Sequence, residues 1–252
     1  MTDPLVCIVM NCHNSSKYLK EAIDSIYSQS YGRWEIIFWD NASTDDSAKI
    51  AKSYDSKLRY FYGNSLVSLY EARNLAVAQC EGDYIAFLDC DDIWVADKLE
   101  RQISEVNRGA KIVYGNFDII DGNGKLVSIR NKKNPSGNIT NQLLTRNSIS
   151  IGSILLKKNI LEKNLFDPFY DLLGDFELWI RLSLRYEIVS LDVVVELSRA
   201  HDANLSDLYR DKWATERRHF YLKFVRKNSV FKFPSIVRYA IMTEIKSLFR
   251  KR

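Results

Sequence analysis

The stretch YIAFLDCDD, residues 84–92, decides how the chain folds. Tyr84 to Leu88 form a continuous apolar run of strand length, and three carboxylates follow within the next four residues. An apolar run of this length predicts a strand that is buried on both faces. Helical apolar spacing resumes over residues 97–107, so the stretch is read as a strand, an acidic turn and a helix.

The same alternation of strand and helix continues on both sides of this stretch. Apolar runs of strand length occupy residues 5–10, 36–39, 58–62 and 112–114, and helical patterns with their caps occupy residues 19–27, 41–54 and 69–78. Apolar strands that alternate with amphipathic helices predict an α/β fold. We expect a Rossmann-like, mostly parallel central sheet with helices on both faces.

The pattern becomes looser in the second half of the chain. Residues 117–120 and 126–129 flank the turn sequence Asp-Gly-Asn-Gly and predict a hairpin. A helix over 175–186 and a strand over 188–195 follow, and two basic, aromatic-rich helices over 207–227 and 234–249 complete the chain. We therefore expect a C-terminal helical extension on the α/β domain.

Composition excludes several classes of protein. The chain has 252 residues, 46% hydrophobic and 27% charged, which is ordinary for a globular protein. It has no run of roughly 18 apolar residues, and its first four residues lack the basic region of a secretory signal, so we expect a cytoplasmic protein. Without any C-x-x-C spacing, we expect its four cysteines to be reduced thiols. These cysteines are Cys7, Cys12, Cys80 and Cys90.

The net charge of +4 conceals two opposite regions. Residues 210–252 hold thirteen basic and three acidic side chains, whereas residues 1–209 hold 23 basic and 29 acidic ones. A basic tail on an acidic body indicates an anionic partner, either nucleic acid or an anionic membrane surface. Because no nucleic-acid-binding module is present, we expect no nucleic-acid partner. The tail predicts peripheral attachment to a membrane, with packing on the protein as the alternative.

Carboxylates gather at the predicted carboxyl ends of the strands. Asp40 ends one strand, and Asp89, Asp91 and Asp92 end another. Ligands of open α/β sheets bind at these ends. Clustered carboxylates repel one another unless a cation holds them, which favours Mg²⁺ or Mn²⁺, although one of them could simply cap the next helix. Residues 11–16 contain no glycine, so a dinucleotide-binding loop or a P-loop is excluded there and a metal-held diphosphate is favoured.

Four motifs in order resemble family 2 glycosyltransferases of the GT-A fold. They are VCIVM at 6–10 leading to Tyr18-Leu19, EIIFWDNASTD at 35–45, EARN at 71–74 and GDYIAFLDCDDIW at 82–94. The resemblance covers residues 5–115 and continues more weakly to 206. It implies a glycosyltransferase domain over 1–206, with a nucleotide-sugar-binding half at 1–115 and an acceptor-binding half at 116–206. Residues 207–252 then form a basic amphipathic tail.

The resemblance also assigns roles in donor binding. Asp40 corresponds to the aspartate that reads the nucleotide base, and Arg73 to an arginine beside it, although each could instead have only a structural role. Asp89-Cys90-Asp91 corresponds to the family's D-x-D motif, in which Asp91 contacts Mn²⁺ or Mg²⁺ and Asp89 contacts the ribose or a metal-bound water. Further candidates at the nucleotide pocket are Asn11, Asp92 and Trp94, and by analogy a UDP-sugar is the favoured donor.

The acceptor half carries two more candidates. GDFELWIRL at 174–182 is similar to the family's acidic motif, which implies that Asp175 is the base that deprotonates the acceptor hydroxyl. A helix N-terminus favours its ionised form. Glu177 is the competing candidate. Arg199-Ala200-His201 resembles a segment whose histidine completes the metal site in some members, although a lone histidine is often only a loop residue.

The function implied is inverting transfer of a sugar to a glycan or lipid-linked acceptor in bacterial cell-surface polysaccharide or lipopolysaccharide biosynthesis. Three other classes use similar residues. A metal-dependent sugar nucleotidyltransferase would release pyrophosphate, and a glycoside hydrolase could use Asp91 and Asp175 as a carboxylate pair without any nucleotide. A non-catalytic nucleotide-binding protein would bind the donor, and replacing Asp175 would leave turnover unchanged.

Overall fold

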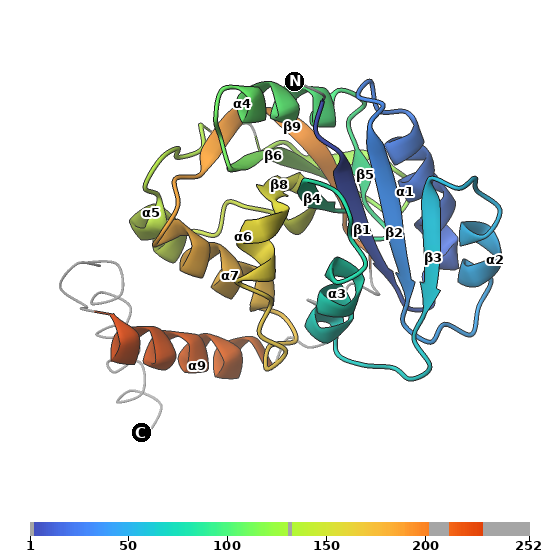
Figure 1. Cartoon of the computed structure of the whole chain (residues 1–252). Helices are drawn as coiled ribbons and strands as arrows, with labels where there is room; N and C mark the ends of the chain where they lie inside the picture. Colours follow the sequence, from blue (N-terminus) through green and yellow to red (C-terminus); the bar gives the residue numbers. More distant parts are fainter. Residues whose placement is uncertain (1–2, 131–132, 202–211, 229–252) are drawn as a thin grey trace.

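A computed structural model of the chain describes residues 3–130, 133–201 and 212–228. In this described part, nine strands form one sheet in the order β3-β2-β1-β4-β8-β6-β9-β5, with β7 paired to β6 (Figure 1). The strands are β1 (Val6–Cys12), β2 (Trp34–Asp40), β3 (Leu58–Tyr62), β4 (Tyr84–Phe87), β5 (Ile93–Trp94), β6 (Ile112–Ile120), β7 (Leu126–Ser128), β8 (Ile154–Lys157) and β9 (Val189–Arg199).

Most of the central strands run in one direction. β3, β2, β1 and β4 pair in parallel, and β6 pairs in parallel with β9. β8 lies between these two groups and is antiparallel to both of its neighbours, β4 and β6. The predicted Rossmann-like sheet is therefore confirmed, and the carboxyl ends of β1, β2 and β4 meet at one edge.

Helices cover both faces of the sheet, as predicted. They are α1 (Ser16–Tyr27), α2 (Ser47–Ala51), α3 (Leu69–Val77), α4 (Lys98–Asn107), α5 (Thr140–Thr145), α6 (Lys158–Glu162), α7 (Gly174–Ser183) and α9 (Lys212–Lys227). Alternate residues of β1 enter two separate cores: Val6 and Ile8 pack with α1, whereas Cys7 and Val9 pack with α3. Burial on both faces explains why these strands are continuous apolar runs.

The two halves of the chain share this sheet, because β8 of the second half pairs with β4 of the first. β8, β5, α5 and α6 have no counterpart among the predicted elements. The segments predicted as two strands at 112–114 and 117–120 form the single strand β6, whose register with β9 shifts around Asn116. The predicted domain boundary near residue 206 lies outside the described residues and stays a prediction.

One prediction about the cysteines is wrong. Cys7 of β1 and Cys80, which follows α3, form a disulfide with their Cα atoms 5.8 Å apart. The bridge joins two residues that are 73 positions apart, so local spacing did not reveal it. Cys12 and Cys90 are free and buried, as expected. The neighbouring Cys90 thiol lowers the pKa of Cys12 to about 7.

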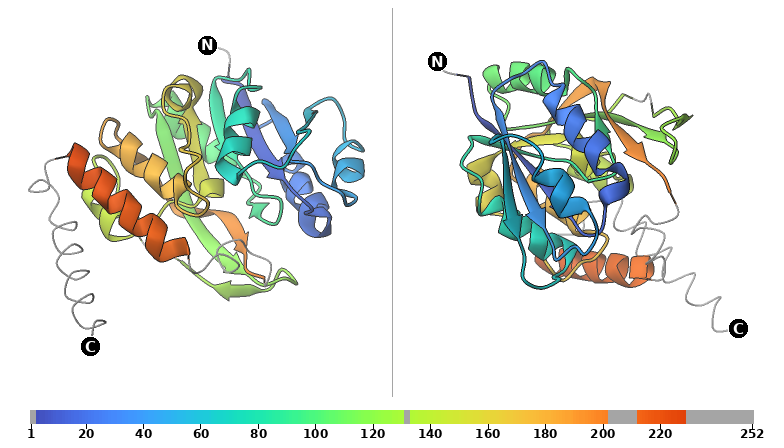
Figure 2. Two further views of the ribbon diagram at one scale, coloured as in Figure 1. Left: turned by 90° about the horizontal axis from the view of Figure 1, so that it is seen from below. Right: turned by 90° about the vertical axis from the view of Figure 1, so that its right-hand side faces the viewer.

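The helix α9 packs on the second half of the domain (Figure 2). Its aromatic residues Phe220 and Phe224 are buried in the same core as α7. The apolar face predicted for the first basic helix is therefore covered by protein for most of its length, whereas Leu222 remains half exposed. The second basic helix, predicted at 234–249, lies outside the described residues. Among the described residues, no helix is long and apolar enough to cross a membrane.

Candidate functional site

The candidate site lies at the edge where β1, β2 and β4 end. Register places Asn11 of β1 beside Trp39, and Cys12 beside Asp40 at the end of β2. The acidic turn that follows β4 is tied to β1, because the Cys90 thiol donates to the Asn11 carbonyl at 3.2 Å. Parallel strand direction thus brings together side chains that are far apart in sequence.

Asp40 is fully buried at this edge. Its carboxylate accepts hydrogen bonds from the Tyr60 hydroxyl at 2.6 Å and from the Ser43 amide at 2.8 Å. These bonds fix the turn after β2. The assignment of Asp40 to the nucleotide base stays a prediction.

Asn11 carries a polar group without a protein partner. Both its side-chain nitrogen and its side-chain oxygen are buried, and neither has a hydrogen-bond partner among the described residues. A buried amide that lacks partners costs free energy of roughly 1–3 kcal/mol. The assignment of Asn11 to the nucleotide pocket stays a prediction.

Arg73 reaches the site from α3 and pairs with Asp89. Its Nη2 lies 2.7 Å from Asp89 Oδ1, and only 3% of Arg73 is exposed. The guanidinium also lies 5.3 Å from the ring centroid of Tyr70. The predicted contact of Arg73 with the base stays a prediction; the structure shows that Arg73 pairs with Asp89.

Asp91 and His201 come together, as their predicted role requires. His201 Nε2 lies 3.0 Å from Asp91 Oδ2, although the two residues are 110 positions apart. Burial and the neighbouring charge of Asp89 raise the pKa of Asp91, and the His201 hydrogen bond opposes this rise. The described residues contain no cluster of three or more His, Cys, Asp or Glu side chains suited to a metal. A cation here would have two protein ligands and would need oxygens from substrate and water.

Asp92 and Trp94 point away from this cluster. Asp92 is buried, accepts a hydrogen bond from the Arg199 amide at 2.7 Å, and has its pKa raised well above the usual value by burial and by Glu196. The Trp94 ring is buried, and its Nε1 donates to the Gly152 carbonyl at 2.9 Å. Both residues fasten the acidic turn to its surroundings.

Asp175 lies in the first turn of α7 and faces Tyr70 of α3. Its Oδ1 accepts from the Phe176 amide at 2.7 Å and lies 3.4 Å from the Tyr70 hydroxyl. A Cβ at Gly174 would lie 2.5 Å from the Tyr70 ring, so only glycine permits this close approach. Burial raises the pKa of Asp175, and the charge of Arg73 lowers it in part.

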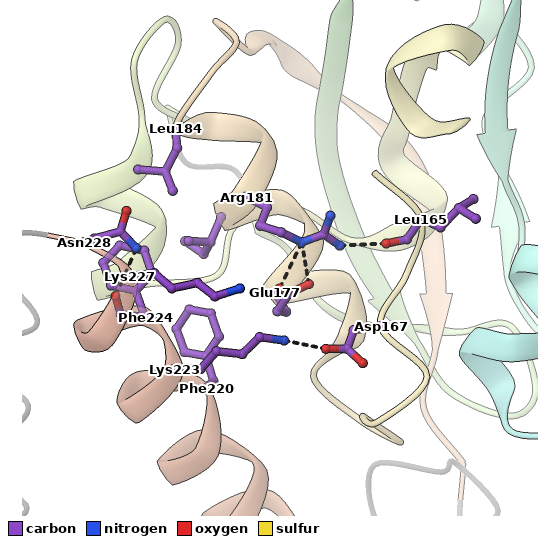
Figure 3. A pocket seen from close by; sticks show the side chains of 11 residues that line it. Leu165, Asp167, Glu177, Arg181, Leu184, Phe220, Lys223, Phe224, Lys227 and Asn228 are labelled. Atoms are coloured by element: carbon purple, nitrogen blue, oxygen red, sulfur yellow. Dashed lines mark hydrogen bonds and ion pairs between the residues drawn. The ribbon is translucent and has the colours of Figure 1, made fainter. Parts of the chain in front are cut away.

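Glu177 faces the other side of α7. Two positions along a helix correspond to about 200° of rotation, so the side chains of Asp175 and Glu177 point to opposite sides of α7. Both Glu177 oxygens lie 2.9 Å from Arg181 Nε. Figure 3 shows this pair in a pocket between α7 and α9, with Phe220 and Lys223 on the opposite wall. Asp175, not Glu177, therefore belongs to the same cluster as Asp89.

Two residues that contact the candidate site, Tyr70 and Arg199, were given no role in the sequence-based prediction. Tyr70 lies between Arg73 and Asp175, and burial raises its pKa well above 10. Arg199 donates from Nε to the Asp91 carbonyl at 2.8 Å and pairs with Glu21 at 2.6 Å. Two features of the sequence could have indicated these residues. Tyr70 lies three positions before Arg73, on the same helix face, and Arg199 lies two positions before His201.

The sheet order and the acidic edge define a GT-A fold. Residues 1–349 of TarS from S. aureus, solved in complex with UDP-GlcNAc, superpose with a TM-score of 0.68 at 18% identity, over 79% of this chain and 60% of TarS 1–349. A family model described as glycosyl transferase family 2 matches residues 7–164. The chain belongs to this family.

Two curated relatives give the extent of the similarity. The UDP-Glc:alpha-D-GlcNAc-diphosphoundecaprenol beta-1,3-glucosyltransferase WfgD of Escherichia coli is 33% identical over 187 residues, which cover 72% of this chain and 71% of WfgD. An uncharacterized glycosyltransferase of Rickettsia bellii is 31% identical over 208 residues, which cover 79% of this chain. This chain spans only 30% of the Rickettsia protein.

The pairing of Arg73 with Asp89 can be tested by a matched pair of variants. We expect Arg73→Met to lower the free energy of unfolding by about 2 kcal/mol, because the partly buried carboxylate of Asp89 loses its charged hydrogen-bond partner. Arg59→Met removes a more exposed guanidinium that pairs with Glu35 and Glu81, and should cost about 1 kcal/mol or less. Urea denaturation of both proteins measures the difference, and equal losses would contradict a special role for Arg73.

Proposed function

We propose that the protein is an inverting glycosyltransferase that moves a sugar from a nucleoside-diphosphate sugar to a hydroxyl of a glycan or lipid-linked acceptor. We place this reaction in bacterial cell-surface polysaccharide or lipopolysaccharide biosynthesis. Family membership supports the class of reaction. The single observation that carries the mechanism is the contact series Asp175–Tyr70–Arg73–Asp89, which connects the proposed base to the D-x-D motif.

Asp175 is the proposed catalytic base. It takes the proton of the acceptor hydroxyl as the oxygen attacks the anomeric carbon, and the bond from that carbon to the diphosphate oxygen breaks with its electron pair on the diphosphate. Attack from the face opposite the leaving group inverts the anomeric configuration. Since only the ionised carboxylate accepts a proton, activity should fall as the pH drops through the raised pKa of Asp175.

Asp91 and His201 are the proposed ligands of Mn²⁺ or Mg²⁺. A carboxylate oxygen and an imidazole nitrogen 3.0 Å apart suit a divalent cation that completes its shell with substrate oxygens and water. When bound, such a cation neutralises charge on the departing diphosphate. Arg73 holds Asp89 beside this pair. Asn11 is a proposed nucleotide contact, for which its buried amide would have to turn toward the ligand.

A UDP-sugar is the proposed donor and a lipid-linked glycan the proposed acceptor. WfgD, at 33% identity, is by its name a UDP-Glc-dependent enzyme that acts on a diphosphoundecaprenol-linked sugar. TarS shares the fold and was solved with UDP-GlcNAc and with UDP. Both support the donor class, and WfgD supports the acceptor class.

Replacement of the proposed base tests the function directly. We expect Asp175→Asn to lower the rate of sugar transfer by about 10²- to 10⁴-fold, because the amide cannot take the proton. UDP affinity should stay unchanged. Glu177→Gln is the matched control, since it keeps a hydrogen-bonding group for Arg181 and should retain activity within a few fold. Release of UDP in the presence of acceptor is the measurement, and full activity of Asp175→Asn would refute the proposal.

Metal removal tests the second part of the site. We expect a chelator to abolish transfer and added Mn²⁺ or Mg²⁺ to restore it. His201→Ala should raise the Mn²⁺ concentration for half-maximal activity by roughly tenfold or more, because even losing a partner of a metal ligand has that effect. Activity that survives chelation, or an unchanged Mn²⁺ requirement in His201→Ala, would speak against this assignment.

We also propose that the basic tail attaches the protein to the inner face of the cell membrane. With Phe220 and Phe224 packed on the domain, the outer side of α9 presents Arg218, Leu222 and Arg226. Cations beside an exposed apolar residue suit an anionic surface. The full chain should sediment with phosphatidylglycerol vesicles and a chain ending at Asn228 should do so more weakly. Failure of the full chain to sediment would refute the attachment, and equal sedimentation of the two proteins would exclude a contribution from residues 229–252.

A further inference from the structure

One side of α9 follows the segment that leads into α7. Lys212 pairs with Asp171 at 2.6 Å, and Lys223 pairs with Asp167 at 2.5 Å. Between them, the His219 ring stacks on Phe169 with centroids 4.0 Å apart. These positions lie on one face of a helix, so α9 is aligned along residues 167–173 for about three turns.

Glu216 is the centre of this contact. Glu216 is 5% exposed, and its carboxylate accepts three hydrogen bonds from consecutive backbone amides. Asp171 donates to Oε1 at 2.9 Å, whereas Leu172 and Leu173 donate to Oε2 at 3.1 and 3.0 Å. Three successive amides that converge on one anion form a nest, and the positive end of the α7 dipole adds to the attraction.

The peptide held in this way carries the proposed base. Leu173 is the N-cap residue of α7, and its carbonyl accepts from the Glu177 amide at 2.8 Å. The Leu172 carbonyl accepts from the Tyr70 hydroxyl at 3.1 Å. Asp175 follows two residues after the nest, and its carboxylate lies next to the same hydroxyl. The nest therefore fixes the backbone from which Asp175 projects.

Packing alone does not explain a carboxylate at this position. Phe220 and Phe224 supply the apolar contact of α9, and Phe220 lies 5.0 Å from Phe176 between ring centroids. A buried charge is costly unless hydrogen bonds satisfy it, and here backbone amides provide them. What a carboxylate adds over an apolar residue is a defined position for those three amides.

We propose that Glu216 is a positioning residue for Asp175, so that α9 is part of the catalytic unit. The proposal rests on the proposed function, because it assigns Glu216 to the orientation of that base. In this role, a residue of the C-terminal extension affects acceptor activation through the position of Asp175, without touching donor or acceptor itself.

Three full-length variants test this role. Glu216→Gln keeps the shape but weakens the nest, and Glu216→Ala removes it. Lys223→Gln is the control, because it breaks another contact between α9 and the domain, the pair with Asp167, and leaves the nest intact. For each protein, kcat for transfer, UDP affinity by calorimetry and backbone amide exchange over residues 171–175 are measured.

We expect Glu216→Ala to lower kcat by roughly tenfold to hundredfold, as a misplacement of about 1 Å does, with UDP affinity unchanged. Glu216→Gln should lie between Glu216→Ala and the wild type, and Lys223→Gln should match the wild type. Amide exchange over 171–175 should accelerate only in the Glu216 variants.

Two results would overturn the proposal. One is a wild-type kcat in Glu216→Ala. The other is a parallel loss of kcat and UDP affinity, which would indicate a general structural role. Failure of the proposed function is distinguishable, because it would remove transfer from the wild-type chain itself, whereas failure of the positioning role leaves the wild type active.

Discussion

The buried guanidinium of Arg73 is the interaction on which the rest of the site depends. Its charge lies almost entirely out of solvent and is balanced by Asp89 at 2.7 Å. A buried cation is tolerable only with such a partner, so the helix α3 and the acidic turn after β4 must stay in register. On its other side Tyr70 extends the contact to Asp175, and the helix α7 is thereby placed against α3.

The fold could largely be predicted because a parallel sheet covered on both faces has strands that are unbroken apolar runs. Strands were missed where the apolar run is short. β5 has two residues and β8 has four, and β8 runs against its neighbours. The disulfide between Cys7 and Cys80 was missed because it depends on how α3 lies on β1, which spacing does not encode.

Motifs predicted several residues that the structure brings together, whereas the roles of these residues stay predictions. Asp91 and His201 meet although 110 positions separate them, and Asp175 separates from Glu177 as helical geometry requires. Trp94 was a candidate because it follows the acidic cluster, yet its ring turns into the core. The role of Glu216 could not be predicted from sequence, because its partners are backbone amides more than 40 residues away. Every residue except proline has such an amide, so residue type does not identify the partners.

The central claim is a single displacement in which Asp175 activates the acceptor on the face opposite the leaving diphosphate. The most direct measurement is the anomeric configuration of the product by proton NMR, with a donor of known configuration. A single displacement predicts a linkage of the opposite configuration to that in the donor. A product that retains the donor's configuration would contradict it, because retention requires a different arrangement of nucleophile and leaving group.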